Sequence, residues 1–88
     1  MSLPLIMYGA KDCEDTEHVR RRLNEWGIPF QEINIDQDKE AEQFVMFINT
    51  GYRSTPTMVI NAGKIKIIAT EPTDETLKQL LVEAGYSI

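Results

Sequence analysis

LIMYGAKDC, residues 5–13, is the stretch that decides the fold of this chain. Its first four residues form a continuous apolar run, which predicts a short strand buried on both faces of a helix-covered sheet. Gly9 and the polar residues 10–12 predict a turn, and apolar positions then recur at the three- and four-residue spacing of a helix. We expect Asp12 to cap this helix and Gly27 to end it. The pattern therefore places Cys13 at the start of a helix, directly after a buried strand.

The next two segments repeat this strand and helix order. Residues 30–36 alternate apolar and polar side chains, which predicts a second strand with one buried face. A strand, a helix and a strand usually form a right-handed unit with parallel strands. Helical spacing returns over residues 41–48, where Phe47 is expected to extend the apolar face and Gly51 to end the helix.

The C-terminal third contains a hairpin and a helix. Residues 57–60 and 64–68 are β-type runs joined by a short turn, which predicts an antiparallel hairpin whose second strand is an edge. The last helix is expected to begin after the cap Thr73 and to end at Gly85. The sequence thus predicts a single α/β domain over residues 1–88 with the order β-α-β-α-β-β-α.

Composition narrows the classes of function. The 88 residues include nine Lys and Arg against fourteen Asp and Glu, a net charge of −5, so nucleic acid is a poor partner. A single cysteine cannot form an internal disulfide, and one cysteine with one histidine is too few for a usual zinc site, so we expect no bound metal. Without a bilayer-length apolar run or a signal peptide, we expect a cytoplasmic protein that has no membrane partner.

Cys13 is the one side chain of this chain that is capable of thiol chemistry. The positive end of a helix dipole and the nearby cation of Lys11 would lower the pKa of its thiol. Four acidic residues between positions 12 and 17 would raise that pKa, so the direction of the net shift stays open. His18 falls on a different side of the helix from Cys13 and is expected to be a solvated surface residue.

Thr55-Pro56 directly precedes the third predicted strand. Proline cannot donate to a sheet ladder, so it fits the first position of a strand, and by composition alone an ordinary trans turn is the simplest interpretation. Together with the strand and turn that lead to Cys13, however, this dipeptide resembles the glutaredoxin branch of the thioredoxin-like fold. The resemblance spans nearly the whole chain and implies a four-stranded mixed sheet flanked by helices, with a cis-proline at Pro56 and a nucleophilic thiol at Cys13.

The resemblance also implies a binding site for glutathione, which would serve as a co-substrate and not as a bound cofactor. Lys11 would contact one carboxylate of glutathione, and Arg53 would offer a second cation. Thr55 would supply backbone hydrogen bonds to an extended ligand beside Pro56. The other carboxylate would be held at the start of the last helix, where amide groups favour anions. The residues at that start are Thr73 and Asp74.

The chain departs from the family pattern at the active-site motif. The usual Cys-x-x-Cys reads Cys13-Glu14-Asp15-Thr16, so Thr16 would be only a spacer or a weak hydrogen-bond donor. The resemblance then implies a monothiol route, in which Cys13 exchanges with glutathione, a glutathionylated protein or another low-molecular-weight thiol. One alternative is a redox-inactive binding module that captures an extended peptide or a partner protein in the cis-proline groove. Another is a dimer that holds an iron-sulfur cluster between two copies of Cys13 and two external thiols.

Overall fold

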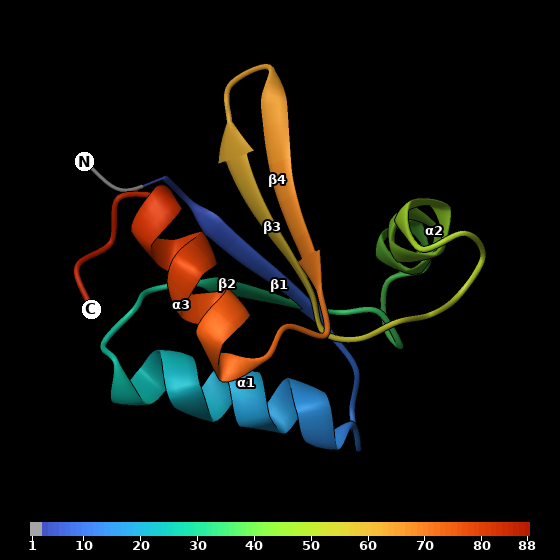
Figure 1. Cartoon of the computed structure of the whole chain (residues 1–88). Helices are drawn as coiled ribbons and strands as arrows, with labels where there is room; N and C mark the ends of the chain where they lie inside the picture. The colour runs from blue at the N-terminus through green and yellow to red at the C-terminus, as the bar shows by residue number, and fades with distance from the viewer. Residues whose placement is uncertain (1–2) are drawn as a thin grey trace.

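A computed structural model describes residues 3–88 of the chain. Its seven elements follow the predicted order, as Figure 1 shows. They are β1 (Leu5–Gly9), α1 (Glu14–Glu25), β2 (Gln31–Asn34), α2 (Lys39–Ile48), β3 (Thr57–Ala62), β4 (Ile65–Thr70) and α3 (Asp74–Glu83). Residues 1–2 of the predicted domain lie outside the described residues. Within the described part, no helix is long and apolar enough to cross a membrane.

The four strands form one mixed sheet in the order β2-β1-β3-β4. β1 runs parallel to β2 and antiparallel to β3, and β3 pairs antiparallel with β4. The parallel pair is joined by α1, as the strand, helix and strand pattern predicted, and β4 is an edge strand as expected. In this register Tyr8 at the end of β1 lies opposite Thr57 at the start of β3, so the loops that flank these residues meet at one end of the sheet.

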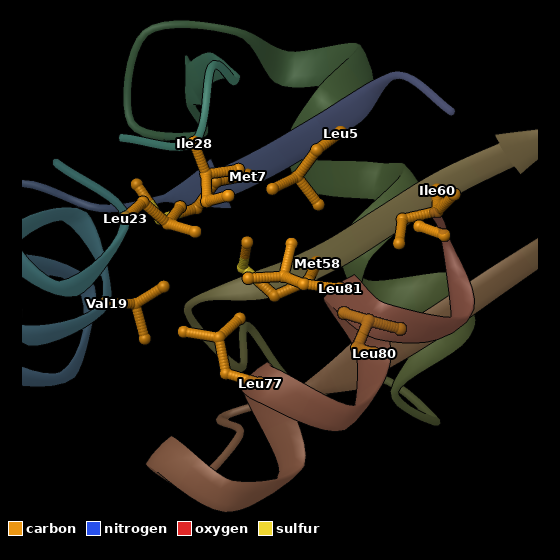
Figure 2. Close-up of a cluster of buried hydrophobic side chains, with 11 residues drawn as sticks. Leu5, Met7, Val19, Leu23, Ile28, Met58, Ile60, Leu77, Leu80 and Leu81 are labelled. Carbon is orange, nitrogen blue, oxygen red and sulfur yellow. The ribbon is translucent and has the colours of Figure 1, made fainter. Parts of the chain in front are cut away.

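One face of the sheet carries the main hydrophobic core, between the strands and the pair α1 and α3. Figure 2 shows side chains from α1, α3, β1 and β3 converging in this cluster. The helical stripe predicted for α1 contributes Val19 and Leu23, which are 2% and 0% exposed. α3 contributes Leu77, Leu80 and Leu81. Burial of these side chains fixes both helices on this face because each would otherwise expose an apolar stripe to water.

α2 covers the opposite face, apart from α1 and α3 (Figure 1). Ala41 and Val45 of α2 form a second cluster with Ile35. The prediction that Phe47 extends the buried face is wrong, because its side chain is 81% exposed. Two residues correspond to a rotation of about 200° around a helix, so Phe47 points away from the sheet when Val45 points toward it. Only the side of α2 that carries Ala41 and Val45 is buried against the sheet.

Candidate functional site

Cys13 occupies the N-cap position of α1, with extended backbone angles and no side-chain cap bond of its own. The prediction that Asp12 caps this helix is wrong. Asp12 has a positive φ of 60° and lies in the turn before the cap, so its carboxylate does not take that role. The turn carries the chain sharply from β1 into α1 and leaves the sulfur of Cys13 at the helix N-terminus, partly buried.

Thr55, which comes from the loop before β3, is a hydrogen-bond partner of the sulfur. Its hydroxyl donates to Cys13 Sγ across 3.2 Å, and the thiol faces the Thr55 carbonyl oxygen at 3.6 Å. The peptide bond between Thr55 and Pro56 is cis. Thr55 is 7% exposed. The predicted nucleophile and the predicted proline loop are therefore in direct contact, although 42 residues separate Cys13 from Thr55 in the chain.

Thr16 is a buried part of the site and more than a spacer. Its side chain is fully buried, and its hydroxyl accepts a hydrogen bond from the backbone N–H of Ala10 at 3.4 Å. A Cβ at Gly9 would lie 2.5 Å from the Thr16 methyl group, so the last residue of β1 and the first turn of α1 pack against each other. Thr16 thus fixes the start of α1, and with it Cys13, against the end of the central strand.

These contacts settle the direction of the pKa shift that the sequence left open. Partial burial raises the pKa of the Cys13 thiol, because burial disfavours the charged form. Hydrogen bonds from Thr16 and Thr55 and from backbone amides of the first turn lower it, and together they outweigh burial. The net pKa of Cys13 is lower than that of an ordinary thiol, in the direction that activates a thiolate for attack.

Asp36 contacts both the backbone of Lys11 and the guanidinium of Arg53. The Asp36 carboxylate accepts from the backbone N–H of Lys11 at 3.0 Å and from Arg53 Nη2 at 2.6 Å. Arg53 Nε also donates to Glu42 at 2.7 Å. Arg53 is thus already paired with two carboxylates, while the Lys11 side chain is exposed. Asp36 therefore links the segment that carries Arg53 to the backbone just before Cys13.

At the start of α3, where the family resemblance implies a carboxylate site, the side chains of Thr73 and Asp74 have partners within the chain. Thr73 is the N-cap, and its hydroxyl accepts from the Thr76 backbone N–H at 3.1 Å. The Asp74 carboxylate binds His18 at 2.7 Å and Arg22 at 3.1 Å. The interpretation of His18 as merely solvated is therefore incomplete, because it links α1 to the start of α3.

Sequence reasoning missed two features of this site. The hydroxyl of Thr55 was overlooked, because only its backbone was expected to act. Asp36 was overlooked as well, although it is the last residue of the second predicted strand, which was expected to be parallel to the strand before Cys13. The ends of neighbouring parallel strands meet at one edge of a sheet, so this position could have been linked to the Cys13 loop. Among residues 3–88, no group of three or more His, Cys, Asp or Glu side chains is placed to hold a metal ion.

Comparison with known proteins identifies relatives of this chain in sequence and in fold. The sequence model of the glutaredoxin family matches residues 5–65. An N-acetyl-S-hydroxy-L-cysteine reductase of Bacillus subtilis (strain 168) is 32% identical over 59 residues, which cover 67% of this chain and 62% of that protein. The chain thus spans less than two thirds of the length of this curated relative.

Solved structures show the same fold. The thioredoxin-like protein BC3987 has a TM-score of 0.71 at 26% identity, over 88% of this chain and 99% of that one. A glutaredoxin from Archaeoglobus fulgidus has a TM-score of 0.64 at 24% identity, over 91% and 86%. The buckwheat glutaredoxin in its glutathione complex has a TM-score of 0.63 at 24% identity, over 94% and 80%. On the match over residues 5–65 and this shared fold, the chain belongs to the glutaredoxin family.

Proposed function

We propose that this chain is a thiol–disulfide oxidoreductase that uses Cys13 alone, in monothiol exchange with glutathione or another low-molecular-weight thiol. The observation that carries the proposal is the contact between Cys13 Sγ and the Thr55 hydroxyl at 3.2 Å, at the N-terminus of α1. The Thr55 hydroxyl donates a hydrogen bond to the sulfur, and it is one of the hydrogen bonds that lower the pKa of the thiol. A larger thiolate fraction near neutral pH favours attack on a disulfide.

The exchange balances in two steps without a second protein thiol. The Cys13 thiolate attacks one sulfur of a disulfide, a new sulfur–sulfur bond forms as the old one breaks, and the other half leaves as a thiolate with the electron pair. A free thiolate then attacks the outer sulfur of the mixed disulfide, which releases a small disulfide and regenerates the Cys13 thiolate. Thr16 stands where a resolving cysteine would stand, so the second step needs an external thiol.

The Bacillus subtilis relative supports a second candidate substrate, a sulfenic acid, in which a hydroxyl group is bonded to the sulfur of a cysteine derivative. Here the Cys13 thiolate attacks the sulfur of the S–OH group, and hydroxide leaves and takes a proton to become water. The product is again a mixed disulfide on Cys13, which one external thiol resolves. Both candidates therefore share the same intermediate and the same residue, and they differ in the leaving group.

The proposal extends to the residues around the sulfur. Thr55 and Thr16 stabilise the thiolate through their hydroxyls, and the cis-proline loop receives the substrate as a short extended strand. The exposed ammonium of Lys11 and the amide groups at Thr73 and Asp74 are the proposed contacts for substrate carboxylates. Arg53 joins them only when it leaves its two carboxylate partners.

A turnover assay tests this function. Hydroxyethyl disulfide is supplied as substrate with excess glutathione, and the oxidised glutathione that forms is measured by coupled reduction. A second assay replaces this substrate with the S-hydroxy derivative of N-acetylcysteine. We expect turnover above the buffer rate for the wild type and the buffer rate for Cys13→Ser. Ser87→Ala, near the C-terminus and far along the chain from the site, is the control and should retain turnover. A wild-type chain without turnover on either substrate would overturn the proposal and favour the peptide-binding alternative.

A further inference from the structure

The charged groups around Cys13 decide which disulfides reach its sulfur, and we propose that the site selects neutral or cationic disulfides over anionic ones. This inference rests on the proposed exchange through Cys13 and names the class of substrate for it. Oxidised glutathione, which carries a net charge of about −2 at neutral pH, belongs to the disfavoured class. The residues that set this preference are Asp36 and Glu42.

Carboxylates flank the sulfur on its own segment. Asp12, Glu14 and Asp15 lie within two residues of Cys13, and all three are exposed. Consecutive Cα atoms are about 3.8 Å apart, so these positions lie within about 8 Å of the Cα of Cys13. At that range, charges exposed to solvent are inside one Debye length at physiological ionic strength. An approaching ligand therefore meets three negative charges next to the reacting atom.

The cation nearest to the proline loop is already neutralised. Arg53 lies two residues before Thr55, the residue that contacts the sulfur. Its guanidinium donates from Nη2 to Asp36 at 2.6 Å and from Nε to Glu42 at 2.7 Å, so two of its three nitrogens already have a carboxylate partner. The hydrogen bond from Arg53 lowers the pKa of Asp36, so this carboxylate is ionised at neutral pH. Arg53 and its partners together carry a net negative charge.

The opposite side of the proline loop shows the same pattern. The backbone N–H of Glu71 donates to the Pro56 carbonyl oxygen at 2.8 Å, which fixes the exposed acidic residue beside the loop. At the start of α3, the Asp74 carboxylate binds both His18 and Arg22. The Arg22 cation on this side is thus also matched with a carboxylate, while Glu71 adds a further negative charge.

These pairs make the surroundings of Cys13 negative although the segments contain cations. Lys11 is exposed, and three exposed carboxylates, those of Asp12, Glu14 and Asp15, follow it within four residues in the chain. An anionic disulfide is repelled before its sulfur reaches the thiolate, whereas a cationic one is concentrated there. The effect acts on the association rate, so it weakens with added salt. The ion pairs of Arg53 contribute to this preference, and loss of that pairing should weaken it.

Three disulfides of different charge test the preference on the full chain. Cystamine is cationic, hydroxyethyl disulfide is neutral and oxidised glutathione is anionic. The rate of mixed-disulfide formation on Cys13 is measured by intact mass at low salt, and each rate is divided by that of a neutral cysteine peptide. We expect the corrected rates to fall in the order cationic, neutral, anionic, with a spread of roughly tenfold that shrinks at high salt.

Two double variants that change the net charge equally distinguish the effect of the carboxylates that pair with Arg53 from the effect of net charge alone. Asp36→Asn with Glu42→Gln frees Arg53, and the amides retain their acceptor oxygens. Glu25→Gln with Glu32→Gln changes the net charge equally, at carboxylates that pair with arginines of α1. Relative to the neutral disulfide, the glutathione disulfide should react roughly threefold faster or more in the first variant. In the second variant this ratio should change by less than about 1.5-fold, because the substituted groups lie farther from Cys13.

The outcomes distinguish this inference from the function on which it rests. A wild type that reacts fastest with oxidised glutathione after correction would overturn the inference and leave monothiol exchange intact. Equal changes in the two double variants would also overturn it, because net charge alone would then account for the preference. Corrected rates no faster than those of the peptide for all three disulfides would overturn the exchange function itself.

Discussion

Replacing Thr55 with valine should raise the pKa of Cys13 and slow its reactions. The substitution removes the hydroxyl that donates to Cys13 Sγ at 3.2 Å and keeps the branched shape of a side chain that is 7% exposed. The sulfur then loses a donor that stabilises its charged form more than its neutral form. The burial that raises the pKa is largely unchanged, so the balance moves toward an ordinary thiol.

The magnitude follows from the difference between charged and neutral hydrogen bonds. A hydrogen bond to a charged group contributes about 1.5–3 kcal/mol, against about 1 kcal/mol for a neutral pair. Because Cys13 is only partly buried, the lower end of this range applies, and the difference is about 0.5 kcal/mol. One pKa unit corresponds to about 1.36 kcal/mol, so Thr55→Val should raise the pKa of Cys13 by about 0.4 units.

The pH dependence of Cys13 alkylation by iodoacetamide measures this pKa in each variant. Thr57→Val is the matched control, because Thr57 is fully buried in the same segment and its hydroxyl bonds Ser54 and Asn49. This control should reduce stability and shift the pKa of Cys13 by less than about 0.2 units. An unchanged pKa in Thr55→Val, or an equal rise in Thr57→Val, would refute the assigned role of the Thr55 hydroxyl.

Three further predictions concern the frame that holds the site. Gly9→Ala should destabilise the fold by about 1–3 kcal/mol in chemical denaturation, because the new Cβ would meet a buried threonine methyl group of α1 at 2.5 Å. Leu81→Ala should cost about 2–5 kcal/mol in the same measurement, since this side chain is fully buried in the main core. Hydrogen bonds from His18 and Arg22 lower the pKa of Asp74, so its stabilising effect is present above the unfolded pKa of about 3.9 and is lost as pH falls through the folded value. Asp74→Asn should therefore flatten the loss of stability in acid, measured as melting temperature against pH; an unchanged slope would contradict this.

Local patterns carried enough information to predict the order of elements. Apolar periodicity separates strands from helices, and it placed Val19 and Leu23 correctly on the buried side of α1. The lysines and the alternation of the last strand indicated an edge, which the sheet order confirms. Because strand, helix and strand units have a preferred hand, the parallel pairing of β1 and β2 also followed from the order.

Contacts between segments far apart in the chain were beyond the reach of these patterns. Phe47 continues the apolar spacing of α2, but which side of the helix is buried depends on how α2 sits on the sheet. Asp12 is a good cap by residue type, yet its turn has a positive φ and leaves the cap position to Cys13. The ion pairs of Arg53 and the contact of the Thr55 hydroxyl with Cys13 also depend on tertiary geometry. Residue identity at these positions shows which interactions a side chain can form but not which partner it has.

The most direct test of the account is the intact mass of the reduced chain after brief exposure to hydroxyethyl disulfide near neutral pH. The account predicts one adduct, which forms faster than on a cysteine peptide, is absent in Cys13→Ser and is removed by added glutathione. A chain that forms the adduct no faster than the peptide, with a rate that rises only as pH approaches about 8.5, would contradict it. Cys13 would then be an ordinary thiol.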